Sequence, residues 1–441
     1  MKPRVFSGGE FRQAGIATLR SLPGFLRRSL AAMPYSRRHV LFAVFAVVLA
    51  AFFFRGDRDP FFLGKRLKAD FAQDYVGARA LVSQEELYPI LGPAFERIGL
   101  KWEVEHRSTH PPSALLLALP LAGLDYPIAL RIWAAAMALC LVAAGRAFGL
   151  PWRWAILAAG LSLAWPPARH STQQHTPIWL LGLALGYRYR ARPFVSGMWV
   201  GLGSLPKFLA ASVLLAYPRR RRWTAWAGFA GVWLAATLAL LLLRPDSLTT
   251  YLASNRINFV DQILREDNGA LGVVAWRLGG IVAVTAVAAL AVLVVWAGGR
   301  SRDEDNWAGL TWLGVALLPI AWVYSLLPLL PWLLRVVVVG RALPCVFGMV
   351  ALLSPLLGPK PTIRPWSVAF CIVMAGAAFF LHAIGENSAV ADVVARRVPW
   401  LVPFVVTQGA RSEPHAAEPH HRPDAADNPR FAPRSFARDD D

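Results

Sequence analysis

Cysteine is scarce in this chain, with three residues in 441. Cys140, Cys345 and Cys371 all lie within apolar runs. A disulfide framework needs paired cysteines, and a thiolate metal cluster needs several thiols at short, regular spacings. The sequence therefore predicts neither feature.

Acidic residues are nearly absent from the apolar parts of the sequence. Between Ser113 and Pro245 the only Asp or Glu is Asp125, and none lies between Trp307 and Gly385. Ion-coupled transporters usually carry ionisable residues at membrane depth and often contain internal repeats. The chain shows no such repeat. These absences disfavour a coupled transporter.

Hydrophobic residues make up 56% of the chain, with 18 tryptophans and a mean hydropathy of +0.43. This exceeds what a soluble core needs. Several of the apolar runs are shorter than the roughly 20 residues that a helix needs to cross a bilayer. We therefore predict an all-α, polytopic membrane protein with about ten to twelve transmembrane helices, some of them kinked or re-entrant. The runs begin near His39, Ser113, Ala129, Trp154, Ile178, Phe194, Trp223, Ile281, Trp307, Val336 and Trp366.

The net charge of +19 is carried by short basic clusters between the apolar runs. Examples are residues 188–192 and 219–222. Such clusters mark the cytoplasmic ends of membrane helices, so they do not indicate a nucleic-acid partner. Residues 1–38 contain eight Lys or Arg against one Glu, which predicts a basic, cytoplasmic or interfacial N-terminal segment. The tail at 408–441 has the composition of a disordered segment.

The basic clusters divide the intervening chain into a predicted transmembrane domain, residues 39–407, with loops on the opposite side. The first such loop, residues 55–110, has nine basic and nine acidic residues. The stretch between the clusters ending at Arg192 and beginning at Arg219 has room for two short helices only. Its turn at Pro206 and Lys207 is then expected on the outer side. Residues 113–124 are expected to be re-entrant or to span partially.

Two carboxylates, Asp70 and Asp74, lie in the first outer loop, directly after the first apolar run. This is where an enzyme acting on a lipid-linked substrate needs a base. A structural interpretation stands beside this one, because Asp70 followed by Gln73 is also a capping-box pattern. The helix that it would open has Phe71, Tyr75, Ala78 and Val82 on one apolar stripe.

Five sequence patterns occur in order along the chain. The first is Asp-Phe-x-x-x-Tyr-x-x-Ala-Arg at residues 70–79, with Leu87-Tyr88 after it, and the second is the Pro-Pro pair and the Leu-Pro-Leu-Ala motif within residues 110–122. The other three are the turn at Gln173-Gln174, the hairpin of residues 197–207, and Ala-Trp-Val-Tyr at residues 321–324. In this order they resemble glycosyltransferase family 87, integral membrane enzymes of the GT-C class similar to polyprenol-phosphate-mannose-dependent alpha-mannosyltransferases. The chain departs from the family in having Gln173 where Gly is usual, and Pro206-Lys207 in reversed order.

The resemblance implies a GT-C-type helical bundle that transfers a hexose, with mannose favoured, from a polyprenyl-phosphate donor. The acceptor would be a glycolipid or polysaccharide at the extracytoplasmic face of a bacterial inner membrane. Asp70 matches the position of the general base of an inverting transfer, which needs one carboxylate. Asp74, Tyr75 and Arg79 would support it or bind the acceptor. No cofactor or metal is expected, because the only Asp-x-Asp spacing in the loop, Asp57 with Asp59, suits interfacial charges.

Cations can replace the general acid when the leaving group is a phosphate. The residues that we expect to bind the donor phosphate or sugar are Lys207, His175, Gln174, His110, Trp322 and Tyr324. Each also has a structural interpretation. Lys207 can extend its amine to the interface, and His175 and Gln174 can satisfy backbone groups at the turn before Pro177. His110 can begin a helix, and the two aromatic residues can anchor the interface.

Two other classes of function remain open from the sequence. A translocase of lipid-linked saccharides without transferase activity would also be polytopic, basic and rich in aromatic residues. A non-enzymatic scaffold for envelope assembly would have the same fold but would lack the catalytic site. Convergence of Asp70, Lys207 and the Gln174 turn on one outward cavity would favour the enzyme, because a catalytic site needs that geometry.

Overall fold

The computed structural model describes residues 70–386, with gaps at 84, 103, 164, 166–173, 218, 267, 340–341 and 357–363. These residues form helices, joined by loops that include one isolated β-bridge between Ile90 and Arg107. The all-α prediction is thus confirmed. The predicted N-terminal segment, the apolar run from His39, the Asp57 and Asp59 pair, Gln173 and the predicted tail lie outside the described residues.

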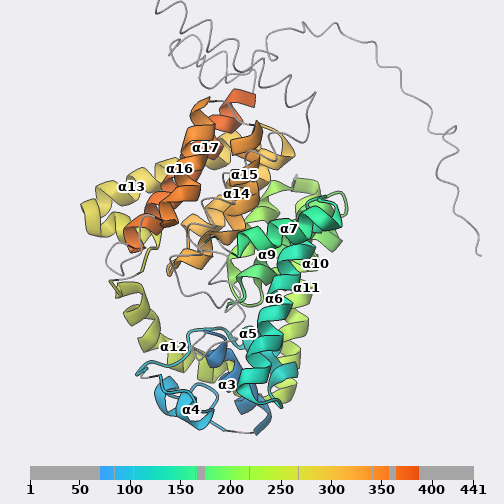
Figure 1. The fold of residues 1–441 in the computed structure, drawn as a ribbon, viewed down its shortest axis with the longest axis vertical. Helices are drawn as coiled ribbons and strands as arrows, with labels where there is room; N and C mark the ends of the chain where they lie inside the picture. The colour runs from blue at the N-terminus through green and yellow to red at the C-terminus, as the bar shows by residue number, and fades with distance from the viewer. Residues whose placement is uncertain are drawn as a thin grey trace, which may run out of the picture.

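Residues 70–121, here called the loop module, form a small helical unit at one end of the molecule (Figure 1). Its elements are α3 (Phe71–Ser83), α4 (Leu91–Arg97), α5 (Pro112–Ala118) and the 3-10 helix η1 (Leu119–Leu121). The apolar stripe of α3 packs against α6 (Tyr126–Ala147), where the Phe71 ring stacks on Trp133 at 4.6 Å between centroids. The stripe is interrupted at its far end, where Val82 is exposed. This packing fixes which side of α3 faces the rest of the protein.

Four of the described helices are long and apolar enough to cross a membrane. They are α6 (Tyr126–Ala147), α11 (Arg219–Leu243), α13 (Leu271–Gly299) and α17 (Arg364–Glu386). The third of them is broken at Gly279 and Gly280, where Gly280 has a φ of +54° that residues with a Cβ rarely adopt. The kink in α13 agrees with the prediction that some of the apolar helices are kinked.

The remaining helices are shorter, and together with the four long ones they form what we call the membrane body. They are α7 (Trp152–Ser162), α9 (Thr176–Arg188), α10 (Pro193–Ser204), η2 (Phe208–Ala216), α12 (Ser247–Leu264), α14 (Asp303–Ala316), η3 (Val323–Leu329), α15 (Leu330–Val339), α16 (Ala342–Leu353) and η4 (Ser354–Leu356). The short pair α10 and η2 occupies the stretch predicted to hold two short helices. The predicted partial span at residues 113–124 appears as the short elements α5 and η1.

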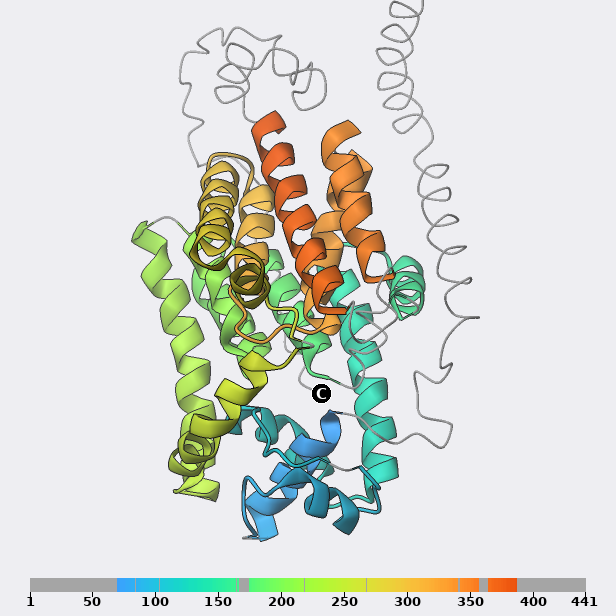
Figure 2. The ribbon, with the colours of Figure 1, turned by 90° about the vertical axis from the view of Figure 1, so that its left-hand side faces the viewer.

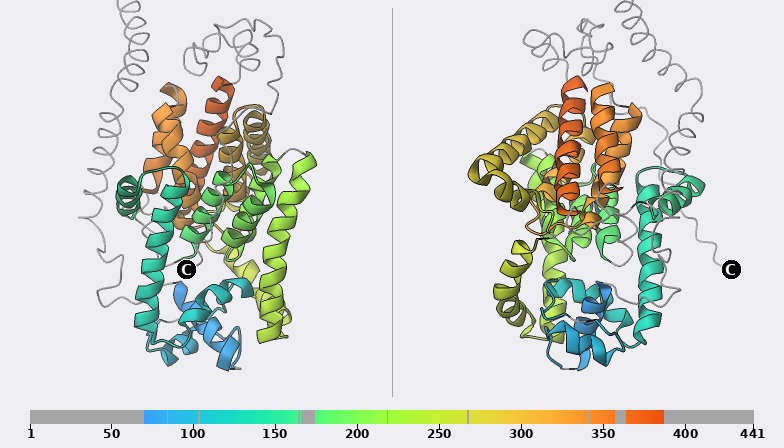
Figure 3. Two further views of the ribbon diagram at one scale, coloured as in Figure 1. Left: turned by 90° about the vertical axis from the view of Figure 1, so that its right-hand side faces the viewer. Right: turned by 60° about the vertical axis from the view of Figure 1, so that its left-hand side comes forward.

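The loop module lies between the lower halves of α6 and α11, and α12 runs from it towards α13 (Figures 2 and 3). The core of the membrane body contains large aromatic side chains. Among the described residues the indole nitrogens of Trp179 and Trp332 have no hydrogen-bond partner, whereas two other indoles do. Trp312 donates its indole N–H to the carbonyl of Ile372 at 2.6 Å, and Trp165 donates to that of Leu352 at 3.0 Å. Buried indoles normally find such partners.

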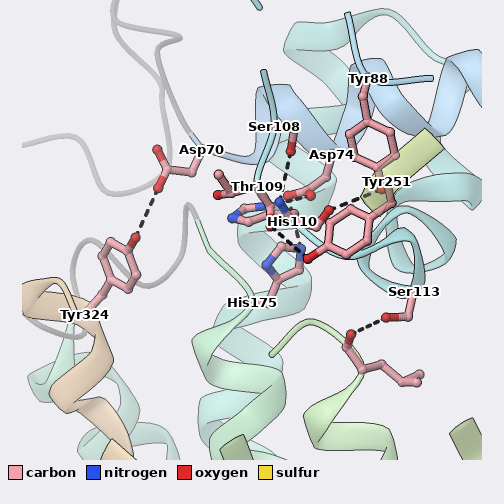
Figure 4. Close-up of polar contacts among 11 residues, drawn as sticks. Asp70, Asp74, Tyr88, Ser108, Thr109, His110, Ser113, His175, Tyr251 and Tyr324 are labelled. Carbon is pink, nitrogen blue, oxygen red and sulfur yellow. Dashed lines mark hydrogen bonds and ion pairs between the residues drawn. The ribbon is translucent and has the colours of Figure 1, made fainter. Parts of the chain in front are cut away.

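Basic side chains gather at the end of the body that lies away from the loop module. Arg188 donates to the carbonyl of Arg146 at 3.3 Å, and Arg190 pairs with Asp303 at 3.6 Å. Because Asp303 begins α14, this helix starts at the basic end and leads back towards η3. The chain thereby returns Tyr324 to the level of the loop module (Figure 4).

Candidate active site

Asp74 lies between two histidines that come from distant parts of the sequence (Figure 4). Its Oδ1 is 2.7 Å from Nδ1 of His110, a hydrogen bond. Its Oδ2 is 3.1 Å from Nε2 of His175, a close contact that falls outside hydrogen-bond geometry. The side chain of Asp74 is fully buried, and the two imidazole rings meet edge to face at 5.1 Å. The carboxylate is therefore held by two rings.

Helix starts position both histidines. His110 comes before Pro111 and Pro112, and Pro112 occupies the first turn of α5. His175 is the N-cap residue of α9, which has Pro177 in its first turn. Proline favours the first turn of a helix because its φ is preset and its missing N–H is not needed there. These proline-fixed helix starts place each imidazole at the edge of an element rather than inside it.

The loop before α5 is held by hydrogen bonds to its backbone. The N–H of His110 donates to Oγ of Ser108 at 3.2 Å, and the Tyr88 hydroxyl donates to the carbonyl of His110 at 3.3 Å. Tyr251 of α12 donates to the carbonyl of Thr109 at 3.5 Å. These contacts fix the position of the His110 ring, and our sequence interpretation did not identify them.

The two histidines keep Asp74 ionised. Burial alone would raise the pKa of the Asp74 carboxyl, but the charges of His110 and His175 and the hydrogen bond with His110 lower it below its usual range. Burial in turn lowers the pKa of the His175 imidazole, against the attraction of the Asp74 carboxylate. Asp74 is thus a poor proton acceptor, and its charged carboxylate is suited to hold the two histidine rings in place.

Asp70 has the opposite character. It lies one helical turn before Asp74, on the same side of α3. Its Oδ2 accepts a hydrogen bond from the hydroxyl of Tyr324 at 3.4 Å (Figure 4). Burial raises the pKa of the Asp70 carboxyl, although His110 and Lys207 pull it in the other direction. A carboxylate with a raised pKa suits the role of a base.

Lys207 follows the turn that ends α10. Its backbone N–H donates to the carbonyl of Ser204 at 3.0 Å, and Ser113 of α5 donates to the neighbouring carbonyl of Leu205 at 2.5 Å. The ammonium group lies 4.8 Å from the centre of the Tyr324 ring. Burial lowers the pKa of Lys207 to about 8, against the attraction of the two aspartates.

The structure thus brings six of the predicted site residues together at the junction of the loop module and the membrane body. They are Asp70, Asp74, His110, His175, Lys207 and Tyr324. Gln174 is buried next to His175, and its Oε1 has no hydrogen-bond partner within the part of the chain that the structure describes. Asp70 and Lys207 both contact Tyr324, so these two residues lie close together, as the geometric condition for an enzyme requires of them.

Three other predicted site residues face elsewhere. Tyr75 is buried and donates its hydroxyl to the carbonyl of Leu124 at 2.5 Å, within the aromatic packing of α3. Arg79 is exposed and lies over the Tyr75 ring, with its guanidinium 5.8 Å from the centroid. Trp322 contacts Arg265, at 5.2 Å between the ring and the guanidinium. The structure does not bring these three into the cluster.

Asp74, His110 and His175 also have the composition of a metal-binding group. Each offers one ligand atom, and these atoms all lie within 4.8 Å of one another. The sequence interpretation missed this combination, because the three residues are separated by 36 and 65 positions.

These features define a class, an all-α membrane protein with a cluster of acidic and basic side chains between a loop module and a helical body. Residues 109–325 match the model of glycosyltransferase family 87. This part of the chain is therefore a glycosyltransferase family 87 domain, and it lies in a membrane protein. The matched range includes His110, His175, Lys207 and Tyr324, whereas Asp70 precedes it. No curated protein and no solved structure matches the chain.

Proposed function

We propose that this glycosyltransferase transfers a hexose, mannose by family resemblance, from a polyprenyl-phosphate donor to a glycolipid or polysaccharide acceptor. Transfer takes place at the extracytoplasmic face of a bacterial inner membrane, with the N-terminus in the cytoplasm. The observation that carries this proposal is the Asp70–Tyr324–Lys207 contact chain, which joins a base and a cation at one end of an apolar helical body.

Asp70 acts as the general base in the proposed reaction. The acceptor hydroxyl attacks the anomeric carbon of the donor sugar, a new carbon–oxygen bond forms, and the bond to the phosphate oxygen breaks. The hydroxyl proton passes to Oδ1 or Oδ2 of Asp70. Attack opposite to the leaving group inverts the anomeric configuration, and a single carboxylate is sufficient for this chemistry. The raised pKa of Asp70 supports the assignment.

Lys207 stabilises the polyprenyl phosphate that leaves. A preorganised cation in a site with little water stabilises developing negative charge more than water does. Lys207 lies over the face of the Tyr324 ring, and the hydroxyl of the same ring bonds to Asp70, so one side chain contacts both the base and the cation. In this proposal the transfer step uses protein groups alone, without a metal ion or cofactor.

Asp74 and its two histidines position this machinery. The charges of His110 and Lys207 both lower the pKa of Asp70, which supports a role for them next to the proposed base. Gln174, next to His175, has an Oε1 without a hydrogen-bond partner among the described residues, and this atom is suited to accept a hydrogen bond from a sugar hydroxyl. These residues supply recognition and orientation, and Asp70 supplies the proton transfer.

The test is transfer of radiolabelled mannose from polyprenyl-phosphate-mannose to endogenous glycolipid in membranes that contain equal amounts of wild type or Asp70→Asn. We expect transfer by the wild type and loss of about 100-fold or more in the variant, the scale of general-base catalysis. Asp125→Asn is the matched control, because Asp125 is exposed and makes no capping hydrogen bond through its side chain.

Equal transfer by wild type and Asp70→Asn would remove Asp70 from the mechanism. Transfer by neither protein, while the wild type moves a lipid-linked saccharide across vesicle membranes, would favour the translocase instead. Loss of transfer in Asp125→Asn as well would show that the assay responds to any change in the carboxylates of this region.

A further inference from the structure

The cluster of Asp74, His110 and His175 joins three separate segments of the protein. Asp74 belongs to α3, His110 directly precedes Pro111 before α5, and His175 caps α9 of the membrane body. The exposed fractions are 0%, 8% and 1% respectively. One potential ligand atom from each residue lies within 4.8 Å of the other two. Three ligand atoms at this spacing surround a volume suited to a single small cation.

Several polar atoms in the cluster have no hydrogen bond among the described residues. They are Oδ2 of Asp74 and both ring nitrogens of His175. Oδ2 and Nε2 face each other at 3.1 Å, but the geometry is not that of a hydrogen bond. A buried polar atom without a partner costs free energy, and native proteins rarely leave one. A cation between the carboxylate and the imidazole would satisfy both atoms.

We propose that Asp74, His110 and His175 form a binding site for one divalent transition-metal ion, with Zn²⁺ the favoured species. Two imidazole nitrogens and one carboxylate oxygen are a ligand set that suits zinc and its transition-metal neighbours. Magnesium and calcium take oxygen ligands in larger number, so two imidazoles disfavour them. Three protein ligands also leave one coordination position for water or another group.

The metal would tie the loop module to the membrane body. Two of its ligands belong to the loop module, and the third begins α9. Metal binding by ligands that are brought together only on folding stabilises the folded arrangement. The inference goes beyond the proposed transfer reaction, and it holds whatever sugar or acceptor the protein uses.

The competing explanation is a metal-free hydrogen-bond cluster. Nδ1–H of His110 can donate to Asp74 at 2.7 Å without any ion. His175 would then need only a small rotation to donate to Oδ2. The two explanations differ in what the imidazole nitrogens supply. Metal binding requires a nitrogen lone pair directed at the ion, whereas the metal-free cluster requires an N–H directed at the carboxylate.

Two substitutions separate the explanations. His110→Asn places an amide N–H near the position of Nδ1, and His175→Gln places one near the position of Nε2, so both variants keep a donor for Asp74. An amide nitrogen has no lone pair to offer a metal. His106→Asn is the matched control, because His106 is half-buried in the same loop and its Nδ1 contacts the carbonyl of Arg107 instead of Asp74.

The experiment uses the full chain in detergent, purified without a polyhistidine tag and stripped with a chelator. Co²⁺ is titrated in and followed by its visible absorption, then displaced with Zn²⁺, and the thermal midpoint is recorded with and without Zn²⁺. We expect about one tight equivalent in wild type and His106→Asn, each with a higher midpoint when Zn²⁺ is present. In His110→Asn and His175→Gln the affinity should fall by more than the ~10–100-fold that loss of an outer partner of a metal ligand causes.

Histidines in the tail, His415, His420 and His421, are common to all four proteins, so the comparison cancels their contribution. Equal Co²⁺ affinity and equal Zn²⁺ stabilisation in all four proteins would overturn the proposal, as would no binding by any of them. Size-exclusion chromatography before titration identifies a variant that has failed to fold. Because metal binding is the readout, the outcome does not depend on whether the protein transfers mannose.

Discussion

The hydroxyl of Tyr324 donates a hydrogen bond to Oδ2 of Asp70 at 3.4 Å and joins positions 254 residues apart. The face of the same ring lies 4.8 Å from the ammonium group of Lys207. One aromatic side chain therefore contacts both the proposed base and the proposed phosphate-binding cation. This arrangement makes Tyr324 a positioning residue whose hydroxyl and ring can be tested separately.

Replacement of Tyr324 by Phe removes the hydroxyl and keeps the ring next to Lys207. The Tyr324 hydrogen bond lowers the pKa of Asp70, so its loss should raise that pKa further. At neutral pH we expect kcat/KM to fall by about 5-fold, the equivalent of about 1 kcal/mol for one long hydrogen bond. The acidic limb of the pH–rate profile should move to higher pH. An unchanged limb would contradict the hydrogen bond between Tyr324 and Asp70.

The Tyr324→Leu variant provides the second half of this comparison, because it removes the ring as well. It should lose more activity than Tyr324→Phe, since the cation–π contact with Lys207 is also lost. Equal activity in the two variants would show that the ring does not position Lys207.

The pH dependence of transfer should be bell-shaped and narrow. Asp70 must be deprotonated to act as a base, and because burial raises its pKa, activity is lost on acidification at a higher pH than for an exposed Asp. Lys207 must be protonated to bind the phosphate, and its pKa is lowered to about 8, so activity is lost as pH rises through about 8. The profile of kcat/KM in detergent-solubilised enzyme measures both limbs.

Lys207→Arg tests which group produces the alkaline limb. A guanidinium stays charged over the whole accessible range, so the limb near pH 8 should disappear even where the maximal rate is reduced. Lys207→Gln should lower the rate at all pH values, by about 100-fold if the charge stabilises the leaving phosphate as one oxyanion-hole donor does. An alkaline limb that persists in Lys207→Arg would assign it to another group.

Much of the fold follows from local sequence patterns. The spacing of the basic clusters predicted two short helices between Arg192 and Arg219, and α10 and η2 are found there. Residues 113–124 were expected to span partially, and they form α5 and η1. The kink of α13 was not located in advance, because only the backbone geometry distinguishes Gly279 and Gly280 from other glycines in apolar runs.

The site could be predicted in part. Asp70, Lys207 and Tyr324 were chosen individually, through their sequence patterns, and the structure places them in contact. The pairing of Asp74 with His110 and His175 was not predicted, because it depends on how α3, α5 and α9 pack together. Helical periodicity predicts the face of the helix on which a residue lies. Which residue of another helix contacts that face is determined by tertiary packing.

A second buried ionic group lies at the basic end of the body and should contribute to stability rather than to transfer. Asp305 is 4% exposed, pairs with Arg335, and accepts a hydrogen bond from Ser301 at 2.7 Å. His382 lies 3.6 Å from the same carboxylate. Removing one partner of a buried pair leaves an uncompensated charge and costs about 3–5 kcal/mol.

Asp305→Asn should therefore lower the thermal midpoint of the detergent-solubilised protein strongly, and Arg335→Met should partly restore it in the double variant. Asp303→Asn is the matched control two residues earlier on α14. Its ion pair with Arg190 is exposed, with side-chain exposures of 76% and 37%, and such pairs contribute about 0–1 kcal/mol. Similar midpoints for the two single variants would contradict the burial argument.

The crossing of α10 and α11 depends on glycine. A Cβ added at Gly197 would overlap the carbonyl of Ala225, and one added at Gly228 would overlap that of Phe194. Backbone atoms cannot move aside as a side chain can, so Gly197→Ala and Gly228→Ala must separate the helices. Small residues commonly permit such close helix contacts in membranes. Because α10 leads into the turn that holds Lys207, both variants should lose transfer activity as well as thermal stability.

Gly231→Ala is the control on the same helix. Its added Cβ has no neighbour within 4 Å, so the change should be neutral, or stabilising by at most about 1 kcal/mol from helix propensity. The comparison of Gly228→Ala with Gly231→Ala by thermal midpoint and mannose transfer separates close packing from propensity. If all three alanine variants behave alike, helix contact at α10 and α11 does not set the position of Lys207. The turn is then held by its other contacts, which include the hydrogen bond from Ser113 to the carbonyl of Leu205 and the one from the Lys207 N–H to the carbonyl of Ser204.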